Sequence, residues 1–326
     1  DSLFEGRVAR PGAGRKSHGA GQSGVFIIEF TTQGEKNMNT LKSLILLAVL
    51  SAILMFIGGA VGGKSGLFIA FGIALVMNFV SYWWSDKIVL KLYQAKEVTA
   101  QDAPELYNDV QDLAQRAGLP MPKVYITPQE QPNAFATGRD PQHGAVAVTA
   151  GIMKLLSREE LRGVLAHELA HIKNRDILIS SIAATIATAI TYLAYMAQFA
   201  AIFGGGGGGR DERGGNPLGL LVMAIVAPLA ATVVRLAISR TREYGADKGG
   251  AEISGNPISL ANALRKLGAY TERIPLRVSD QVADSTSHMF IASPLSGKAM
   301  ASLFSTHPPM EERIRRLEDM AAGISR

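Results

Sequence analysis

The sequence predicts a mainly α-helical membrane protein, with four transmembrane helices in two hairpins and one α+β domain on one side of the membrane. Three observations favour this fold class. Hydrophobic residues make up 47% of the 326 residues and charged residues only 19%, which is below the share usual in soluble domains. Four stretches without charge are long enough to cross a bilayer. The remaining segments alternate between helical and strand patterns, as a folded domain does.

The four charge-free stretches are the candidate membrane spans, at residues 43–63, 65–85, 177–203 and 214–234. Each has about the 20 residues that a hydrocarbon layer of ~30 Å requires. The alternative is a soluble protein with four buried core helices, each without a polar face. The spacing of the stretches predicts two hairpins, over residues 38–85 and 177–238.

Positive charges beside the spans predict their orientation, because Lys and Arg near a span tend to remain in the cytoplasm. They gather before the first and third spans and after the second and fourth: Lys36, Lys42, Lys87, Lys91, Lys96, Lys173, Arg175, Arg235, Arg240 and Arg242. The linkers inside the hairpins carry few or balanced charges. Residues 86–176 and 239–326 are therefore predicted to form one split cytoplasmic domain.

Residues 1–37 have no apolar period and precede the stretch MNTLKSLILLAV, which reads like a natural start. They are predicted to be a disordered extension or an artefact. The first span is too long for a signal peptide, so it is predicted to remain as an anchor.

Net charge and cysteine content restrict the partners. A net charge of +5 and a pI near 9.4 would suit nucleic acid. The positions of the charges beside the spans instead predict a lipid bilayer as partner and no nucleic acid. Cysteine is absent, which excludes a disulfide-stapled fold and any thiolate ligand. A metal site would have to use histidine and carboxylate.

The first part of the predicted cytoplasmic domain contains sequence patterns typical of helices and strands. Residues 103–120 have helical apolar spacing and end in glycine and proline, which predicts a helix. Three strands are predicted after it, at residues 123–127, 133–138 and 144–149. Ser157 and Glu160 have the spacing of a capping box, so a second helix is predicted to begin at Arg158 and run through His171.

This second helix contains the stretch HELAH, with His167, Glu168 and His171. Residues four apart lie on one face of a helix, so both imidazoles could reach one ion at about 2.1 Å. Glu168 lies beside them, where it could take a proton from a water whose pKa the metal lowers and pass it to a leaving amine. The alternative is a polar helix face with hydrogen-bonded histidines. The motif predicts a hydrolytic zinc site.

A hydrolytic zinc needs a third protein ligand and an open fourth position. Glu243 follows the fourth span on the same predicted side as His167. Asp247 lies four residues later on the same helical face and could hold a ligand histidine by its free ring N–H. Alternatively, both acids form a solvated face paired with Arg240 or Arg242. Spacing alone does not decide between these two interpretations.

Several stretches resemble peptidase family M48, the zinc metallopeptidases: PNAFATG, AVTAGIMKLLSREELRGVLAHELAHIKNRD, SRTREYGADKGGAEISGNP and STHPPMEERIRRL. The resemblance covers about residues 38–326. It implies a zincin-like metalloprotease domain with one Zn²⁺ per chain, in which Glu243 is the third ligand and Glu168 the general base. It also implies that Asn174 and Asp247 support the ligands. The HExxH motif then belongs to the first part of the catalytic domain and the third ligand to the second part.

The same resemblance places His307 and Arg313 near the scissile carbonyl. Cationic or hydrogen-bonding groups there would stabilise the oxyanion of the tetrahedral intermediate. The alternative is that His307 and the prolines after it only begin the last helix.

A protease must also hold its peptide extended, which an exposed strand edge does through main-chain hydrogen bonds. Asn133, Ala134 and Phe135 are predicted to line this cleft. The alternative is an ordinary core hairpin, and the family resemblance favours the substrate strand.

Together these features predict an integral membrane zinc endopeptidase. The charges around the motif, among them Arg158, Glu159 and Arg175, are too costly for hydrocarbon, so the site is expected at the membrane surface. Two alternative functions are less well supported. In a scaffold that only binds zinc, Glu168 would have no role, and a transporter would need paired carboxylates inside the membrane. The resemblance implies cleavage of misfolded membrane proteins at the cytoplasmic face of the bacterial inner membrane, in quality control and stress response. The physiological substrates and the oligomeric state are not defined by the sequence.

Overall fold

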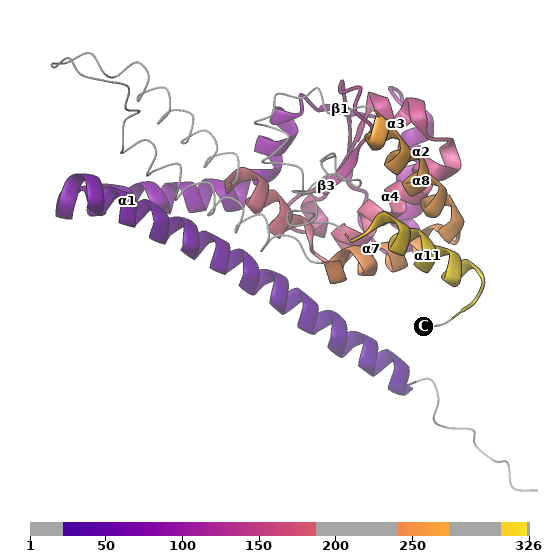
Figure 1. Cartoon of the computed structure of the whole chain (residues 1–326), viewed down its shortest axis with the longest axis horizontal. Helices are drawn as coiled ribbons and strands as arrows, with labels where there is room; N and C mark the ends of the chain where they lie inside the picture. Colours follow the sequence, from indigo (N-terminus) through magenta and orange to yellow (C-terminus); the bar gives the residue numbers. More distant parts are fainter. Residues whose placement is uncertain (1–21, 187–239, 274–307, 325–326) are drawn as a thin grey trace, which may run out of the picture.

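The computed structural model describes residues 22–186, 240–273 and 308–324. A long helical element, α1, extends from a domain in which helices pack on a four-stranded sheet (Figure 1). The domain is built from both sides of residues 187–239, because elements from before and after this segment pack on one another.

Helix α1 (Gln22–Leu92) is broken at Gly63, where φ is 58° and ψ is −142°. Glycine adopts this positive φ without the steric cost that a Cβ would add. The break gives two arms that meet at one end, as Figure 1 shows. The two arms contact each other where Asn78 Nδ2 donates to Ser51 Oγ at 2.8 Å. The break thus lies at the turn predicted for the first hairpin.

The predicted membrane spans are described only in part. One helix among the described residues, Gly63–Leu92, is long and apolar enough to cross a membrane, and it contains the second predicted span. The first span holds a shorter apolar helix, Leu47–Phe56, and the third begins with another, Ile177–Ile186. The rest of the third span and the whole of the fourth lie outside the described residues. Four spans therefore remain a prediction.

The N-terminal segment differs from its prediction. Helix α1 begins at Gln22, so residues 22–37 are helical, which differs from the disordered extension but does not test the alternative of an artefact. Extending an existing helix adds one hydrogen bond for each residue fixed, whereas starting a new one is unfavourable. A segment with weak signals of its own can therefore continue a neighbouring helix. Residues 1–21 lie outside the described part.

The sheet confirms the three predicted strands and adds a fourth. Its strands are β1 (Lys96–Val98), β2 (Lys123–Thr127), β3 (Ala134–Thr137) and β4 (Ala145–Thr149). Their order is β1-β2-β4-β3, with β2 and β4 parallel and the other pairs antiparallel. Strand β1 has three residues, too few to show an alternating pattern. Among the described strands, β3 lies at an edge.

Both predicted helices of the first segment are confirmed. Helix α2 (Pro104–Ala117) ends at Gly118 in the left-handed conformation, with φ 68°. Helix α4 (Arg158–Lys173) begins with the predicted capping box. The Ser157 hydroxyl accepts from the Glu160 N–H, and the Glu160 carboxylate accepts from the Ser157 N–H at 2.7 Å. This arrangement fixes the start of the helix that carries HELAH.

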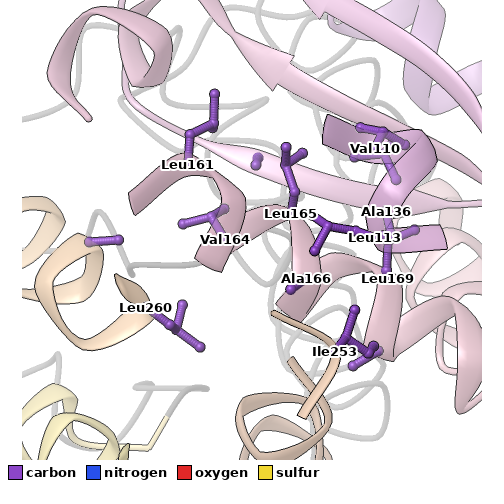
Figure 2. Close-up of a cluster of buried hydrophobic side chains, with 14 of the residues drawn as sticks. Val110, Leu113, Ala136, Leu161, Val164, Leu165, Ala166, Leu169, Ile253 and Leu260 are labelled. Atoms are coloured by element: carbon purple, nitrogen blue, oxygen red, sulfur yellow. The ribbon is translucent and has the colours of Figure 1, made fainter. Parts of the chain in front are cut away.

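Helix α4 lies at the centre of the domain, packed against α2, β3, α7 (Arg240–Ser254) and α8 (Pro257–Arg273). Two more helices complete the domain: α3 (Ala150–Leu155) packs on β4, and α11 (Met310–Ala321) packs on α8 and α7. Figure 2 shows part of the apolar cluster around α4: Val110, Leu113, Ala136, Leu161, Val164, Leu165, Ala166, Leu169, Ile253 and Leu260. Close packing of this kind fixes α4 relative to α7.

The other face of the sheet packs on the end of α1. Val89, Leu90 and Tyr93 belong to one buried apolar cluster with Phe135, and the rings of Tyr93 and Phe135 are 5.0 Å apart between centroids. Alternate residues of β3 thus face α4 and α1. The sheet connects the HELAH helix to the apolar arm of α1.

The contact between α4 and α7 depends on glycine. A Cβ at Gly250 would lie 2.8 Å from the backbone of His167. We expect Gly250→Ala to push the helices apart, lowering the free energy of unfolding by about 1–3 kcal/mol and weakening metal binding. The matched control is Gly245→Ala on the same helix, where a Cβ meets open space. It should be neutral or stabilising by up to ~1 kcal/mol. Unfolding in detergent with both variants measures the difference, and equal stabilities would contradict the packing argument.

Candidate metal centre

Three candidate ligands come together between α4 and α7. His167 and His171 lie on one face of α4, with ring centroids 4.8 Å apart, and Glu243 faces them from α7. One nitrogen or oxygen of each residue lies within 4.8 Å of the other two. The structure therefore brings the predicted ligand set to one place.

The distances suit a tetrahedral ion. Nε2 of His167 lies 3.9 Å from Glu243 Oε2, and Nε2 of His171 lies 3.7 Å from Glu243 Oε1. Ligand atoms around a tetrahedral zinc with bonds of ~2.0–2.1 Å are ~3.4 Å apart. The two nitrogen–oxygen distances are a few tenths of an ångström longer than this, and all three ligand atoms lie within 4.8 Å of one another. The residues therefore fit a zinc ion if the side chains close in around it.

Asp247 lies behind His167, as the four-residue spacing from Glu243 predicted. Its Oδ1 is 3.0 Å from Nδ1 of His167. Its carboxylate also accepts from Nε and Nη2 of Arg313, at 2.8 and 2.7 Å. Asp247 is buried. The alternative of a solvated pair with Arg240 or Arg242 is therefore wrong for this residue, and Nε2 of His167 is left to face Glu243.

His171 has an equivalent contact that the sequence reasoning missed. Its Nδ1 lies 3.0 Å from Oδ2 of Asp176, which is also buried. Asn174, which the family resemblance implied here, forms the C-cap of α4 through its backbone N–H. The only sequence signal was an acidic residue just after the helix. Asp176 reaches His171 because Arg175, with a φ of 60°, turns the chain back toward that histidine.

Glu168 lies close enough to the candidate ligands for its charge to interact with those of His171 and Glu243. Its carboxylate is 5% exposed and accepts the N–H of Ala136 at 2.9 Å. Burial raises the pKa of Glu168 to about 7, with a further contribution from the charge of Glu243 and opposition from His171 and the Ala136 hydrogen bond. A carboxyl with a pKa near neutrality can both accept and return a proton.

The predicted substrate strand lies directly beside this base. Asn133, Ala134 and Phe135 are all buried. Ala136 uses its N–H on Glu168 and not on β4, so this edge of β3 faces the site. The Phe135 side chain packs on Tyr93 at the opposite face of the sheet. Binding of a peptide by β3 stays a prediction.

Arg313 lies behind the ligands and is fully buried. Besides its contacts with Asp247, its Nη1 lies 3.6 Å from Oε2 of Glu243. Burial alone would lower the pKa of Arg313, but the charge and hydrogen bonds of Asp247 raise it. The direct contact is with the residues that support the site, and its predicted action on the oxyanion stays a prediction. His307 lies outside the described residues.

The buried pair of Asp247 and Arg313 predicts a pH dependence of stability. Burial would raise the pKa of Asp247, but Arg313 outweighs this and lowers it from 3.8 to about 2. A folded pKa below the unfolded one stabilises the fold above the unfolded pKa, and this stability is lost as the pH falls from about 4 to 2. We expect about 2 kcal/mol to disappear in that window. Urea unfolding at each pH measures it, and Asp247→Asn should remove this part of the slope; parallel curves for parent and variant would contradict the assignment.

Comparison with known proteins agrees with this geometry. The sequence model of Peptidase family M48 matches residues 100–321. A protein described as "Protease HtpX homolog" from Thermodesulfovibrio yellowstonii is 60% identical over 284 residues, covering 87% of this chain and 99% of that protein. Another from Desulfatibacillum aliphaticivorans is 59% identical over 279 residues, covering 86% and 89%.

Among solved structures, the crystal structure of S. mikatae Ste24p matches with a TM-score of 0.46 and 19% identity, covering 90% of this chain and 67% of that one. The family and the HtpX homologues together indicate a membrane-associated protease. The family match spans more than half of the chain and the relatives are 59–60% identical over most of it. The chain therefore belongs to peptidase family M48, a family of zinc metallopeptidases, as its motifs predicted.

Proposed function

We propose that this chain is an integral membrane zinc endopeptidase that binds one Zn²⁺ through His167, His171 and Glu243. The observation that carries the proposal is the orientation of the two imidazoles. Both Nε2 atoms point at the Glu243 carboxylate, while both Nδ1 atoms lie 3.0 Å from buried carboxylates. The hydrogen bond between His171 and Asp176 presents Nε2 of that ring as a basic, oriented ligand, and the Asp247 carboxylate lies at the same distance from the His167 ring.

When bound, Zn²⁺ supplies Lewis-acid polarisation of a peptide carbonyl and a lowered pKa for a water. Glu168 takes the proton from that water and later donates it to the leaving amine, and its carboxylate is held in place by the Ala136 N–H. His171 must be neutral to act as a ligand. Burial would lower its pKa, but Asp176 and Glu243 raise it to about 9, so metal uptake displaces a proton from this ring.

Two further groups complete the proposed site. The edge of β3, from Asn133 to Phe135, holds the substrate peptide extended beside Glu168. His307 and Arg313 stabilise the oxyanion, Arg313 through the positive charge that it brings within 3.6 Å of Glu243. The support for this part is the place of β3 at the edge of the described sheet, where the N–H of Ala136 reaches Glu168.

We propose that the substrates are misfolded membrane proteins, cut at the cytoplasmic face of the bacterial inner membrane during quality control and stress. Tyr82, Trp83 and Trp84 lie near the domain end of the apolar arm of α1 and are exposed. Aromatic rings gather at the membrane interface. The Arg139 guanidinium of the catalytic domain lies 4.5 Å from the Trp83 ring centroid, which brings the domain to this level. Lys87 and Lys91 follow, as expected of the cytoplasmic side.

The proposal is tested on the full chain purified in detergent. We expect about one zinc per chain by elemental analysis, casein cleavage that stops when a chelator removes the metal, and recovery when Zn²⁺ is returned. Cleavage that continues in metal-free protein would refute the mechanism.

The membrane side is tested separately. The chain has no cysteine, so a single Lys154→Cys variant at an exposed position reports location. An impermeant maleimide should label it only after the cells are opened. Labelling in intact spheroplasts would place the domain on the other side.

A further inference from the structure

The start of the helix Ile177–Ile186 contacts the catalytic site in two places, at the ligand His171 and at the end of strand β3. Asp176, the residue just before it, contacts the ligand His171. Ser181, between one and two turns later, contacts Thr137 at the end of β3. The sequence assigned this helix only to the membrane, as the start of the third span.

Asp176 is fixed on His171 by two contacts. Its backbone N–H donates to the His171 carbonyl at 3.0 Å, and its carboxylate lies 3.0 Å from His171 Nδ1. The left-handed conformation of Arg175 brings both groups back toward α4. Asn, Asp and Gly are the residues that favour that conformation, so Arg175 is held there by its surroundings. The carboxylate determines which ring nitrogen of His171 is free, and Nε2 then faces Glu243.

Ser181 is fixed in a similar way on the substrate side. Its Oγ lies 2.7 Å from the Ile177 carbonyl, to which it donates, and 2.7 Å from the Thr137 Oγ1. A hydroxyl has one proton, so Ser181 must accept the hydrogen bond from Thr137. Both side chains are fully buried. Thr137 follows Ala136, whose N–H holds the catalytic Glu168.

We propose that the start of this helix is a positioning element for catalysis, in which Asp176 orients the zinc ligand His171 and Ser181 fixes the end of β3. The inference rests on the proposed zinc peptidase function. It assigns the helix a task beyond anchoring, because one rigid element holds a ligand and the strand beside the base in a fixed relation.

Asp176 also interacts with a positive charge other than the ligand histidine. Arg242 is a half-buried arginine whose charge interacts with Asp176 and with Glu243. If Asp176 only balanced that charge, replacing it would lower the stability of the fold and leave metal affinity unchanged. The experiment must therefore measure zinc affinity and thermal stability separately.

The first test compares Asp176→Ala and Asp176→Asn with the parent, using a competing chelator to measure the zinc dissociation constant. We expect the alanine variant to bind zinc about 10- to 100-fold more weakly. The asparagine variant should lose less, because its amide oxygen still accepts from Nδ1–H. Ser180→Ala is the matched control, since the Ser180 hydroxyl donates to the backbone carbonyl of Asp176 in the same turn and leaves the carboxylate contact with His171 in place. If the alanine variant does not fold, the asparagine variant carries the test.

The second test uses Ser181→Ala and Thr137→Val. Each should lower kcat/KM for a peptide by about 2- to 10-fold, the worth of one hydrogen bond, with zinc affinity unchanged. The double variant should be little worse than either single one, because both remove the same interaction.

The outcomes separate the inference from the function beneath it. A parent chain that binds no zinc refutes the proposed function itself. A parent that binds zinc and cleaves, with Asp176 variants of unchanged zinc affinity, overturns the role of Asp176. Ser181→Ala and Thr137→Val with parental kcat/KM, or with additive losses, overturn the role of the hydroxyl pair.

Discussion

Glu168→Gln is expected to retain about one zinc per chain while casein cleavage falls by about 10²- to 10⁴-fold. The glutamine oxygen can still accept the Ala136 N–H, so the side chain should keep its place. An amide cannot take a proton from water at neutral pH, and this transfer is the step assigned to Glu168. Elemental analysis and cleavage rates on the same preparation measure both parts of the result.

The control for this variant lies on the same helix. Glu159→Gln removes an exposed carboxylate of α4 that lies away from the ligands, and it should cleave like the parent. If Glu168→Gln cleaves as fast as Glu159→Gln, the motif is a structural site and the proposed mechanism is wrong. If the variant loses its zinc, Glu168 supports the metal site in a way that its contact with Ala136 does not show.

Glu243→Ala should lose zinc and cleavage together. Its carboxylate faces both Nε2 atoms and is only 12% exposed, so its removal leaves two ligands in a buried site. Removing a residue that merely supports a ligand costs about 10- to 100-fold in metal affinity, and losing a ligand should cost more. Titration with Zn²⁺ against a competing chelator measures the loss, and added zinc should restore part of the cleavage.

Helix α7 provides the comparison. Glu252→Ala removes an exposed carboxylate at the other end of the same helix, so it should bind zinc like the parent. Zinc affinity in Glu243→Ala equal to that of Glu252→Ala would mean that another residue is the third ligand. Glu243 and Glu252 differ in burial and in contact with the histidines. A difference in zinc affinity between the two variants therefore reports on those two features of Glu243.

The features that the sequence determined by itself are local. The capping box at Ser157 and Glu160, the helix that ends at Gly118 and the pairing of His167 with His171 depend on residues within a few positions of one another. Helical periodicity places these residues in space without any knowledge of the rest of the chain. The same holds for the charge-free stretch that became the apolar arm Gly63–Leu92.

Other features were decided only by the tertiary structure. Spacing left Glu243 and Asp247 open between a metal site and a solvated face. The packing of α7 on α4 buries Asp247 and brings Glu243 to the two histidines, because a Gly250 without a side chain lets the helices approach. The contact of Arg313 with Asp247 joins two helices distant in sequence. Asp176 reaches His171 through a backbone turn at Arg175 that its residue type disfavours. Such contacts depend on long-range packing and on conformations imposed by neighbours, and local spacing contains neither.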